Sequence, residues 1–159
     1  MNTSRRVLKF NSLDDALAET RGLLQSGYTM LGQWDLGQIC GHCADWLRFP
    51  ADGYPRAAFP LNAMLWALKS TIGPSMRRKI VREGGFRAGK PTMPQTVKPR
   101  GQLNDVAGVA ALQAAADRFQ QHSGPWHASP LFGAMSRDEH LQLQLIHLAH
   151  HLGFLIPAT

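Results

Sequence analysis

Two histidines near the C-terminus have the spacing of a helical metal site. His147 and His151 are four residues apart in the stretch HLAHHL. In an α-helix, residues four apart lie about 40° from each other around the axis and one turn apart along it, so their side chains can reach one ion. Zinc enzymes use this spacing for two of their ligands. Ordinary helix surfaces carry it too, so a metal site needs a third ligand from elsewhere in the chain.

Three other histidines are candidates for this third ligand: His42, His140 and His150. His150 lies about 60° from His147 in the opposite direction, so its side chain diverges from the pair. His140 shares the face of the pair but lies roughly 10 Å further along the axis. His42 falls at the edge of an apolar helix face and is expected to point into a seam between helices. Taken alone, His42 is most simply a hydrogen-bonded histidine at the edge of the core.

Both cysteines of the chain flank His42 in the tetrapeptide Cys-Gly-His-Cys, which is similar to the active site of protein disulfide isomerases. Such a site needs a strand that delivers the cysteines to the N-terminus of a helix, where free amides lower the thiol pKa. The preceding residues carry no strand pattern, and a helix begins near Asp35, so Cys40 lies inside it. We therefore expect Cys40 and Cys43 to be small core residues.

Two long helices in the N-terminal half would position His42. Residues 12–27 and 35–50 each begin with a capping box, in which Ser12 and Asp35 are the N-caps. Apolar residues follow at helical spacing in both segments. Pro50 is predicted to end the second helix, because proline cannot continue the hydrogen-bond ladder.

Two more long helices are predicted in the C-terminal half. An alanine-rich helix covers residues 104–123, and the last helix runs from the N-cap Ser136 to Pro157. Shorter helices are predicted at residues 60–71 and 73–85.

The remaining segments are predicted to be irregular. No strand pattern is convincing, apart from an extended stretch at residues 6–10. Residues 84–104 are rich in glycine, proline and basic residues, which predicts a long loop. The sequence therefore predicts an all-α fold, a four-helix bundle with one long irregular crossover, as a single domain over residues 1–159.

The composition indicates the size of the core and the cellular location of the protein. The chain has 159 residues, of which 44% are hydrophobic, which is enough for one core. No run of about 18 apolar residues exists, so we expect no membrane-spanning helix and no membrane partner. Two cysteines make no disulfide framework, and the residues after the arginine pair at 5–6 are too polar for an export signal. A cytoplasmic location is expected.

A basic segment at residues 69–100 accounts for much of the net charge of +6, since it holds nine basic residues and one acid. Such a segment could bind nucleic acid or phosphate. It contains a single aromatic residue, Phe86, so stacking on bases has little support. We therefore favour a solvated basic surface.

Three stretches resemble the DinB-like (DinB/YfiT-like) superfamily, within a subgroup of unknown function. They are WDLGQICGHCADW, PLFGAMSRDEH and HLAHHLGFLIP. The resemblance covers the second helix and the C-terminal third, and the first helix by pattern only. Ser129 stands where such sequences carry a histidine before proline, and His140 where they carry an aromatic residue. Neither departure removes a histidine of the expected metal site.

The resemblance implies a three-histidine metal site in which His42, His147 and His151 bind one divalent ion, zinc or nickel first, with iron and copper as alternatives. It implies an enzyme that acts on a small molecule, by thiol-dependent transferase chemistry with a low-molecular-weight thiol or by hydrolysis. Asp45 and His150 are candidates for acid, base or supporting roles. A homodimer is a further expectation. The main alternative is a non-enzymatic helical module, metal-free or with a structural metal.

Overall fold

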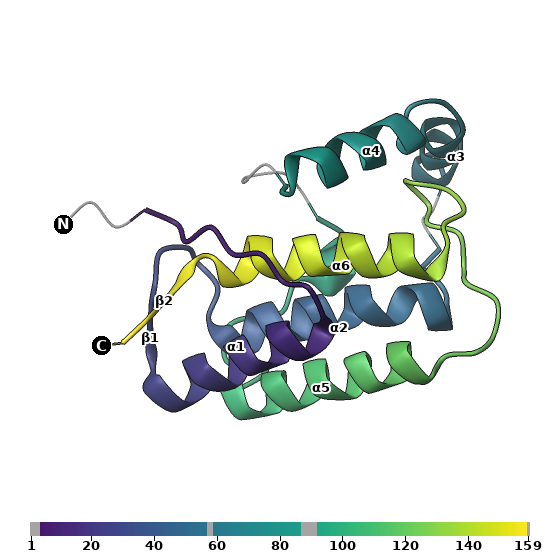
Figure 1. Cartoon of the computed structure of the whole chain (residues 1–159). Coiled ribbons are helices and arrows are strands. Elements are labelled where there is room, and N and C mark those ends of the chain that lie inside the picture. The colour runs from purple at the N-terminus through teal and green to yellow at the C-terminus, as the bar shows by residue number, and fades with distance from the viewer. Residues whose placement is uncertain (1–3, 57–58, 87–91, 159) are drawn as a thin grey trace.

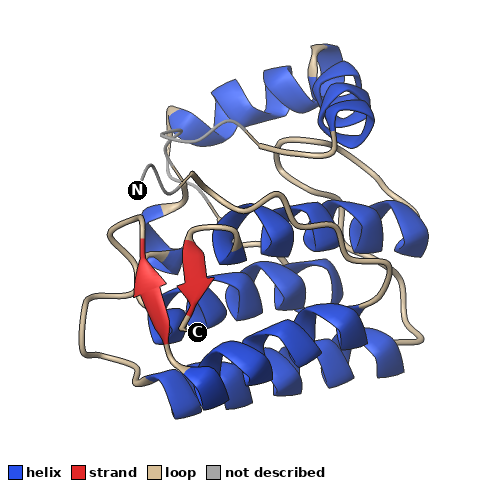
Figure 2. Ribbon diagram, turned by 60° about the vertical axis from the view of Figure 1, so that its left-hand side comes forward, coloured by secondary structure: helices blue, strands red, loops and turns tan. Residues whose placement is uncertain are grey.

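The computed structural model describes residues 4–56, 59–86 and 92–158. Four long helices lie side by side and form the helical body of the molecule (Figures 1 and 2). They are α1 (Leu13–Ser26), α2 (Leu36–Asp52), α5 (Asp105–Gln121) and α6 (Arg137–Leu152). The protein is therefore mostly helical, as the sequence predicts.

Smaller elements complete the fold. Helices α3 (Leu61–Thr71) and α4 (Gly73–Glu83) form a hairpin on one side of the body, with α4 beside α6 (Figure 1). Strands β1 (Tyr28–Met30) and β2 (Leu155–Pro157) pair in antiparallel fashion, and a single 3-10 turn, η1, covers Pro94–Thr96. No helix in the described part of the chain is both long and apolar enough to cross a membrane.

The predicted helix starts are confirmed. Capping boxes join Ser12 to Asp15 at the start of α1 and Asp35 to Gln38 at the start of α2. A third capping box opens α6 at Ser136. In each box a side chain accepts a hydrogen bond from an otherwise unpaired amide, which is why a local sequence pattern predicts these starts well.

Two of the predicted helix ends are wrong. Helix α2 continues through Pro50 to Asp52. The missing amide of Pro50 would leave the Trp46 carbonyl without its helical partner, and Gln144 Nε2 of α6 donates to that carbonyl at 2.9 Å instead. The last helix ends at Leu152 rather than at Pro157.

The residues that follow α6 form a strand that the sequence did not predict. Strand β2 pairs with β1 in the register Tyr28 with Pro157 and Met30 with Leu155. Three-residue strands are too short to show a period-two pattern. Residues 6–10, which were expected to be extended, form no strand.

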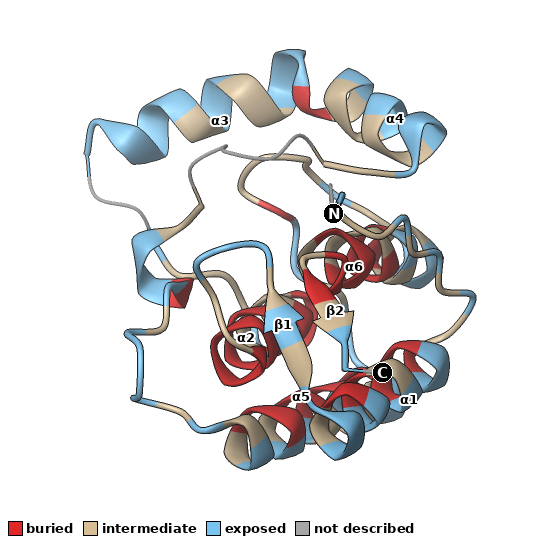
Figure 3. Cartoon of the chain, turned by 90° about the vertical axis from the view of Figure 1, so that its left-hand side faces the viewer, coloured by how far each residue is buried: buried red, intermediate tan, exposed pale blue. Residues whose placement is uncertain are grey.

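Helix α2 is the central helix, and its closest neighbour is α5. A Cβ atom built on Gly108 of α5 would lie 2.6 Å from the Gly37 Cα atom of α2, so the two backbones approach each other where both lack side chains. The buried residues of the four long helices lie on the faces that these helices turn toward one another (Figure 3), and their apolar side chains form the core. They include Leu17, Leu23, Leu36, Ile39, Cys43, Leu47, Leu112, Phe119, Leu148 and Leu152. His42 therefore lies on the most enclosed helix of the protein.

The described part of the predicted long loop is irregular but anchored to α2. Gln38 Nε2 donates to the Lys98 carbonyl at 2.7 Å, and Lys98 Nζ lies 2.6 Å from an Asp45 carboxylate oxygen. Both contacts hold the segment that follows η1 against the face of α2 that carries His42.

Candidate metal centre

Three imidazoles from two helices converge inside the helical body. The Nε2 atom of His147 lies 3.2 Å from Nε2 of His42 and 3.0 Å from Nε2 of His151. All three candidate ligand nitrogens lie within 4.8 Å of one another. The helical spacing brings His147 and His151 together, and the packing of α2 beside α6 adds His42.

A backbone carbonyl fixes the orientation of His42. The Nδ1 atom of His42 lies 3.0 Å from the carbonyl oxygen of Thr96, and both residues are fully buried. A carbonyl oxygen only accepts, so Nδ1–H must donate and the neutral ring carries its lone pair on Nε2. That lone pair is directed at the other two histidines. Histidine ligands of metals commonly donate their second N–H to a carbonyl in this way.

The two short nitrogen–nitrogen contacts cannot both be good hydrogen bonds between neutral rings. His42 offers a lone pair at Nε2, so His147 must supply the proton for their contact. The same proton would then have to serve the contact with His151 as well. If His147 instead accepts from His151, two lone pairs face each other at the contact with His42. A cation bound by all three lone pairs removes this conflict.

The separations also fit a metal ion. Nitrogen ligands at about 2.0–2.1 Å from zinc in a tetrahedral arrangement lie about 3.3–3.4 Å from one another. Two of the three separations, 3.2 Å and 3.0 Å, are close to this spacing, and the third is within 4.8 Å. The donor set and its geometry therefore fit a first-row divalent ion.

Burial keeps the three imidazoles neutral, which is the form that binds metals. Desolvation lowers the pKa of His42 to about 4 and that of His151 to about 2, and it holds the pKa of His147 well below its usual range. The neighbouring imidazoles lower the pKa values of His147 and His151 further, because each would repel a second positive charge.

Aromatic side chains surround the three histidines. The Trp34 ring stacks on His151 with centroids 5.4 Å apart, and Trp46 meets His147 edge-on at 5.7 Å. Phe86, from the described end of the segment after α4, meets His147 at 5.7 Å. These rings exclude water and lower the local dielectric constant.

The sequence did not assign Thr96, Trp34 or Phe86 to the site. Every residue carries a carbonyl, so nothing in the sequence marks Thr96 as the partner of His42. The two aromatic rings come from loops whose path depends on the whole fold.

The structure places the two candidate acid–base residues outside the group of three histidines. Asp45 forms the ion pair with Lys98, two residues after Thr96. His150 diverges from the pair, as the helical geometry predicts, and its Nδ1 lies 3.1 Å from an Arg5 guanidinium nitrogen. Its ring centroid is 4.9 Å from that of His151, so it borders the site without joining it.

The cysteines are packing residues, as expected. Cys40 and Cys43 are free and at most 1% exposed. Burial raises the pKa of both thiols well above its usual value, which disfavours the reactive thiolate. His140 is likewise buried, beside Trp126, with ring centroids 5.8 Å apart.

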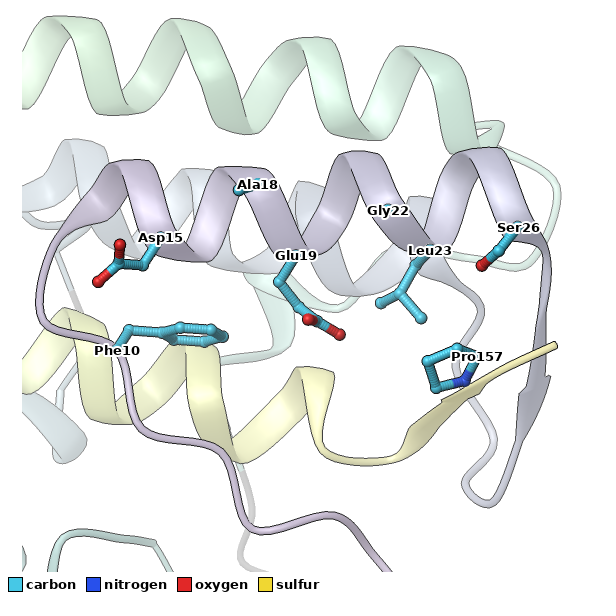
Figure 4. Close-up of a pocket in the computed structure, with 8 residues that line it drawn as sticks. All are labelled: Phe10, Asp15, Ala18, Glu19, Gly22, Leu23, Ser26 and Pro157. Carbon is cyan, nitrogen blue, oxygen red and sulfur yellow. The ribbon is translucent and has the colours of Figure 1, made fainter. Parts of the chain in front are cut away.

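A surface groove of about 620 Å³ lies along α1, between the N-terminal segment and β2 (Figure 4). Its two carboxylates are already engaged. Asp15 caps α1, and Glu19 lies 2.6 Å from an Arg6 guanidinium nitrogen. The groove therefore offers less chemistry than the histidine cluster.

No curated protein and no solved structure matches the chain. One family model, described as "Protein of unknown function (DUF1569)", matches residues 2–158. The match covers nearly the whole chain, including all three histidines, and the protein therefore belongs to this uncharacterised family.

Proposed function

We propose that the protein is a metal-dependent enzyme in which His42, His147 and His151 hold one divalent ion within a DinB-like four-helix bundle. The observation that carries the proposal is the convergence of three Nε2 atoms, with the lone pair of His42 directed inward by the Thr96 carbonyl. Three protein ligands leave a coordination position open for water or substrate, which is typical of catalytic rather than structural zinc sites.

Zinc and nickel are the proposed ions, with iron and copper as alternatives. All three donors are imidazole nitrogens, which suit each of these metals, so availability decides among them. Hard oxygen-seeking ions such as calcium and magnesium are disfavoured by the same donor set.

The proposed reaction is a thiol-dependent transfer or a hydrolysis on a small molecule, with a low-molecular-weight thiol as one substrate. A bound ion would supply Lewis acidity and lower the pKa of a water or thiol in the open position. Trp34, Trp46 and Phe86 line the histidines and would exclude bulk water, which strengthens electrostatic effects inside the site.

Two further residues have supporting roles in this proposal. Asp45 positions the site, because its ion pair with Lys98 holds the segment that carries Thr96 against α2. His150 is the candidate acid–base group at the border of the site, where its Nδ1 contacts Arg5.

The proposal also places the protein in the cytoplasm. Its two cysteines are free and buried, which fits a compartment that keeps thiols reduced.

The direct test is metal content followed by activity. Full-length protein purified without an affinity tag should contain one equivalent of a divalent metal by elemental analysis. The loaded and chelated forms are then assayed with an activated ester and with a low-molecular-weight thiol plus an electrophile. Metal-dependent turnover that is lost in His42→Ala supports an enzyme. A tightly bound metal with no turnover of either kind would support the non-enzymatic module instead.

A further inference from the structure

Exposed apolar side chains are concentrated on the α3–α4 hairpin, which we define as residues 59–83. Of nine large hydrophobic side chains that are exposed in the described part of the chain, five lie between residues 59 and 72. Phe59 is 82% exposed, Trp66 65% and Met64 53%. The other two are Leu61 and Ile72. Helix α3 contains no buried residue at all. Apolar patches of this kind on a folded protein mark interaction sites.

The hairpin lies on one side of the molecule in all three ribbon views (Figures 1–3). Arg77 of α4 anchors it to α6 through an ion pair with Glu139, with 2.9 Å between the charged atoms. Gly73, at the junction of α3 and α4, packs closely against the Leu131 carbonyl. The anchored hairpin therefore holds α3 on the outside of the molecule, where its apolar side chains are exposed.

The charge of the protein is concentrated on the same segment. Residues 59–83 contain five basic residues and one acid, a net charge of +4. The rest of the chain has twelve basic and ten acidic residues, a net charge of +2. Arg78 and Arg82 are exposed and have no acidic partner among the described residues. Both arginines line a shallow groove between α4 and α6, on the same helical hairpin that carries the exposed apolar side chains.

We propose that the α3–α4 hairpin docks on the surface of an anionic lipid bilayer. Tryptophan, phenylalanine and leucine beside exposed arginines are typical of elements that lie in the membrane interface. The apolar side chains enter the boundary between headgroups and acyl chains, while Arg78 and Arg82 bind lipid phosphates. Neither helix can cross the bilayer, so both lie in its plane. This proposal revises the expectation that the protein has no membrane partner.

The other occupants of such a surface fit less well. A second copy of the chain would place two hairpins of net charge +4 against each other, since Glu83 is the one acid in residues 59–83. Nucleic acid would neutralise the arginines but would leave Leu61, Met64 and Ile72 without an apolar environment. An anionic bilayer satisfies both the charge and the apolar side chains.

The test is sedimentation of the full-length protein with lipid vesicles. Binding to vesicles of phosphatidylcholine with phosphatidylglycerol should greatly exceed binding to phosphatidylcholine alone and should weaken with salt. The double variant Arg78→Gln with Arg82→Gln should lower the partition coefficient about 30-fold. Trp66→Ala should lower it roughly tenfold, because interfacial burial of the indole is lost.

Matched variants on the far side of the helical body serve as controls. Arg21→Gln removes an exposed cation of α1 that forms no ion pair with the described residues, and Val106→Ala shortens an exposed apolar side chain on α5. Both variants should bind vesicles as the parent does. Equal loss of binding in the controls, or no binding to anionic vesicles, would overturn the proposal. Self-association that rises with protein concentration and is abolished by the Arg78 and Arg82 variant would also overturn the proposal, because it would indicate a second copy of the chain as the partner. DNA binding that the same variant abolishes, without binding to vesicles, would overturn it in favour of nucleic acid.

Discussion

The His42 side chain uses both of its ring nitrogens, one for the Thr96 carbonyl and one toward the histidines of α6. It is the only candidate ligand outside α6, so it alone would connect a bound ion to a second helix. Metal binding should therefore stabilise the fold by mass action.

His42→Ala should remove most of this metal-dependent stabilisation. At a free metal concentration a hundred times the dissociation constant, the parent protein should gain about 2.7 kcal/mol. Thermal or urea unfolding of each variant is measured with metal and with chelator. The difference between the two measurements gives the metal-dependent stabilisation, because the cavity that the substitution creates is present in both. His150→Ala is the matched control and should keep the full gain, because Nδ1 of His150 bonds to Arg5. A His42→Ala protein that metal stabilises as strongly as the parent would show that α2 supplies no ligand.

The thiols of Cys40 and Cys43 should be unreactive in the folded protein. Both side chains are at most 1% exposed, and burial raises their pKa values, so little thiolate is available. A chromogenic disulfide reagent at pH 7.5 should label neither thiol until denaturant is added, and then both. Rapid labelling of the folded protein would reopen the disulfide-exchange interpretation of the Cys-Gly-His-Cys stretch.

At the scale of single residues, spacing predicted the pair on α6 because both histidines share one helix. The link to His42 required knowledge of how two distant helices pack, which spacing alone does not contain.

The packing of α2 against α5 sets the position of His42 at the scale of elements. A methyl group on Gly108 would lie 2.6 Å from the Gly37 Cα atom and 2.7 Å from the Gly37 carbonyl oxygen. Backbone atoms cannot rotate away as side chains do, so the two helices would have to separate.

Gly108→Ala should therefore lower the free energy of unfolding by about 2–3 kcal/mol. It should also weaken metal binding, since it displaces the helix that carries His42. Gly22→Ala is the matched control, because nothing lies within 4 Å of the added methyl group on the exposed face of α1. That control should raise the free energy of unfolding by about 0.5–1 kcal/mol. Equal stability changes in both variants, measured by urea unfolding, would argue against the close contact of α2 with α5.

The starts of the helices could be predicted from sequence because a capping box is complete within four residues. The end of α2 could not, because the carbonyl that Pro50 leaves without a helical partner is satisfied by Gln144, almost a hundred residues away. The segment around Thr96 appeared only as a loop, and its role comes from its contacts with α2.

The whole molecule should lose stability in mild acid when no metal is bound. Burial lowers the pKa of His42 and of His140 to about 4, against about 6.5 in an unfolded chain. Below pH 6.5 the unfolded state therefore binds more protons than the folded state, and stability falls as the pH falls. His42 and His140 should each lower the free energy of unfolding by on the order of 2 kcal/mol between pH 7.5 and pH 5.0.

Urea unfolding in the presence of chelator at these two pH values measures the loss. His140→Phe should reduce the loss in free energy of unfolding between the two pH values by the amount that one histidine contributes, because Phe does not titrate. A parent protein with the same stability at both pH values would show that these histidines are not buried in the neutral form.

The central claim is that three histidines from α2 and α6 hold one divalent ion. The most direct measurement is anomalous X-ray scattering from crystals of tag-free protein, with data collected at the zinc, nickel, copper and iron edges. We predict one strong peak, about 2.0–2.1 Å from the Nε2 atoms of His42, His147 and His151, at a single metal edge. A peak at Cys40 and Cys43, or no peak near the three histidines in crystals grown with added metal, would contradict the assignment.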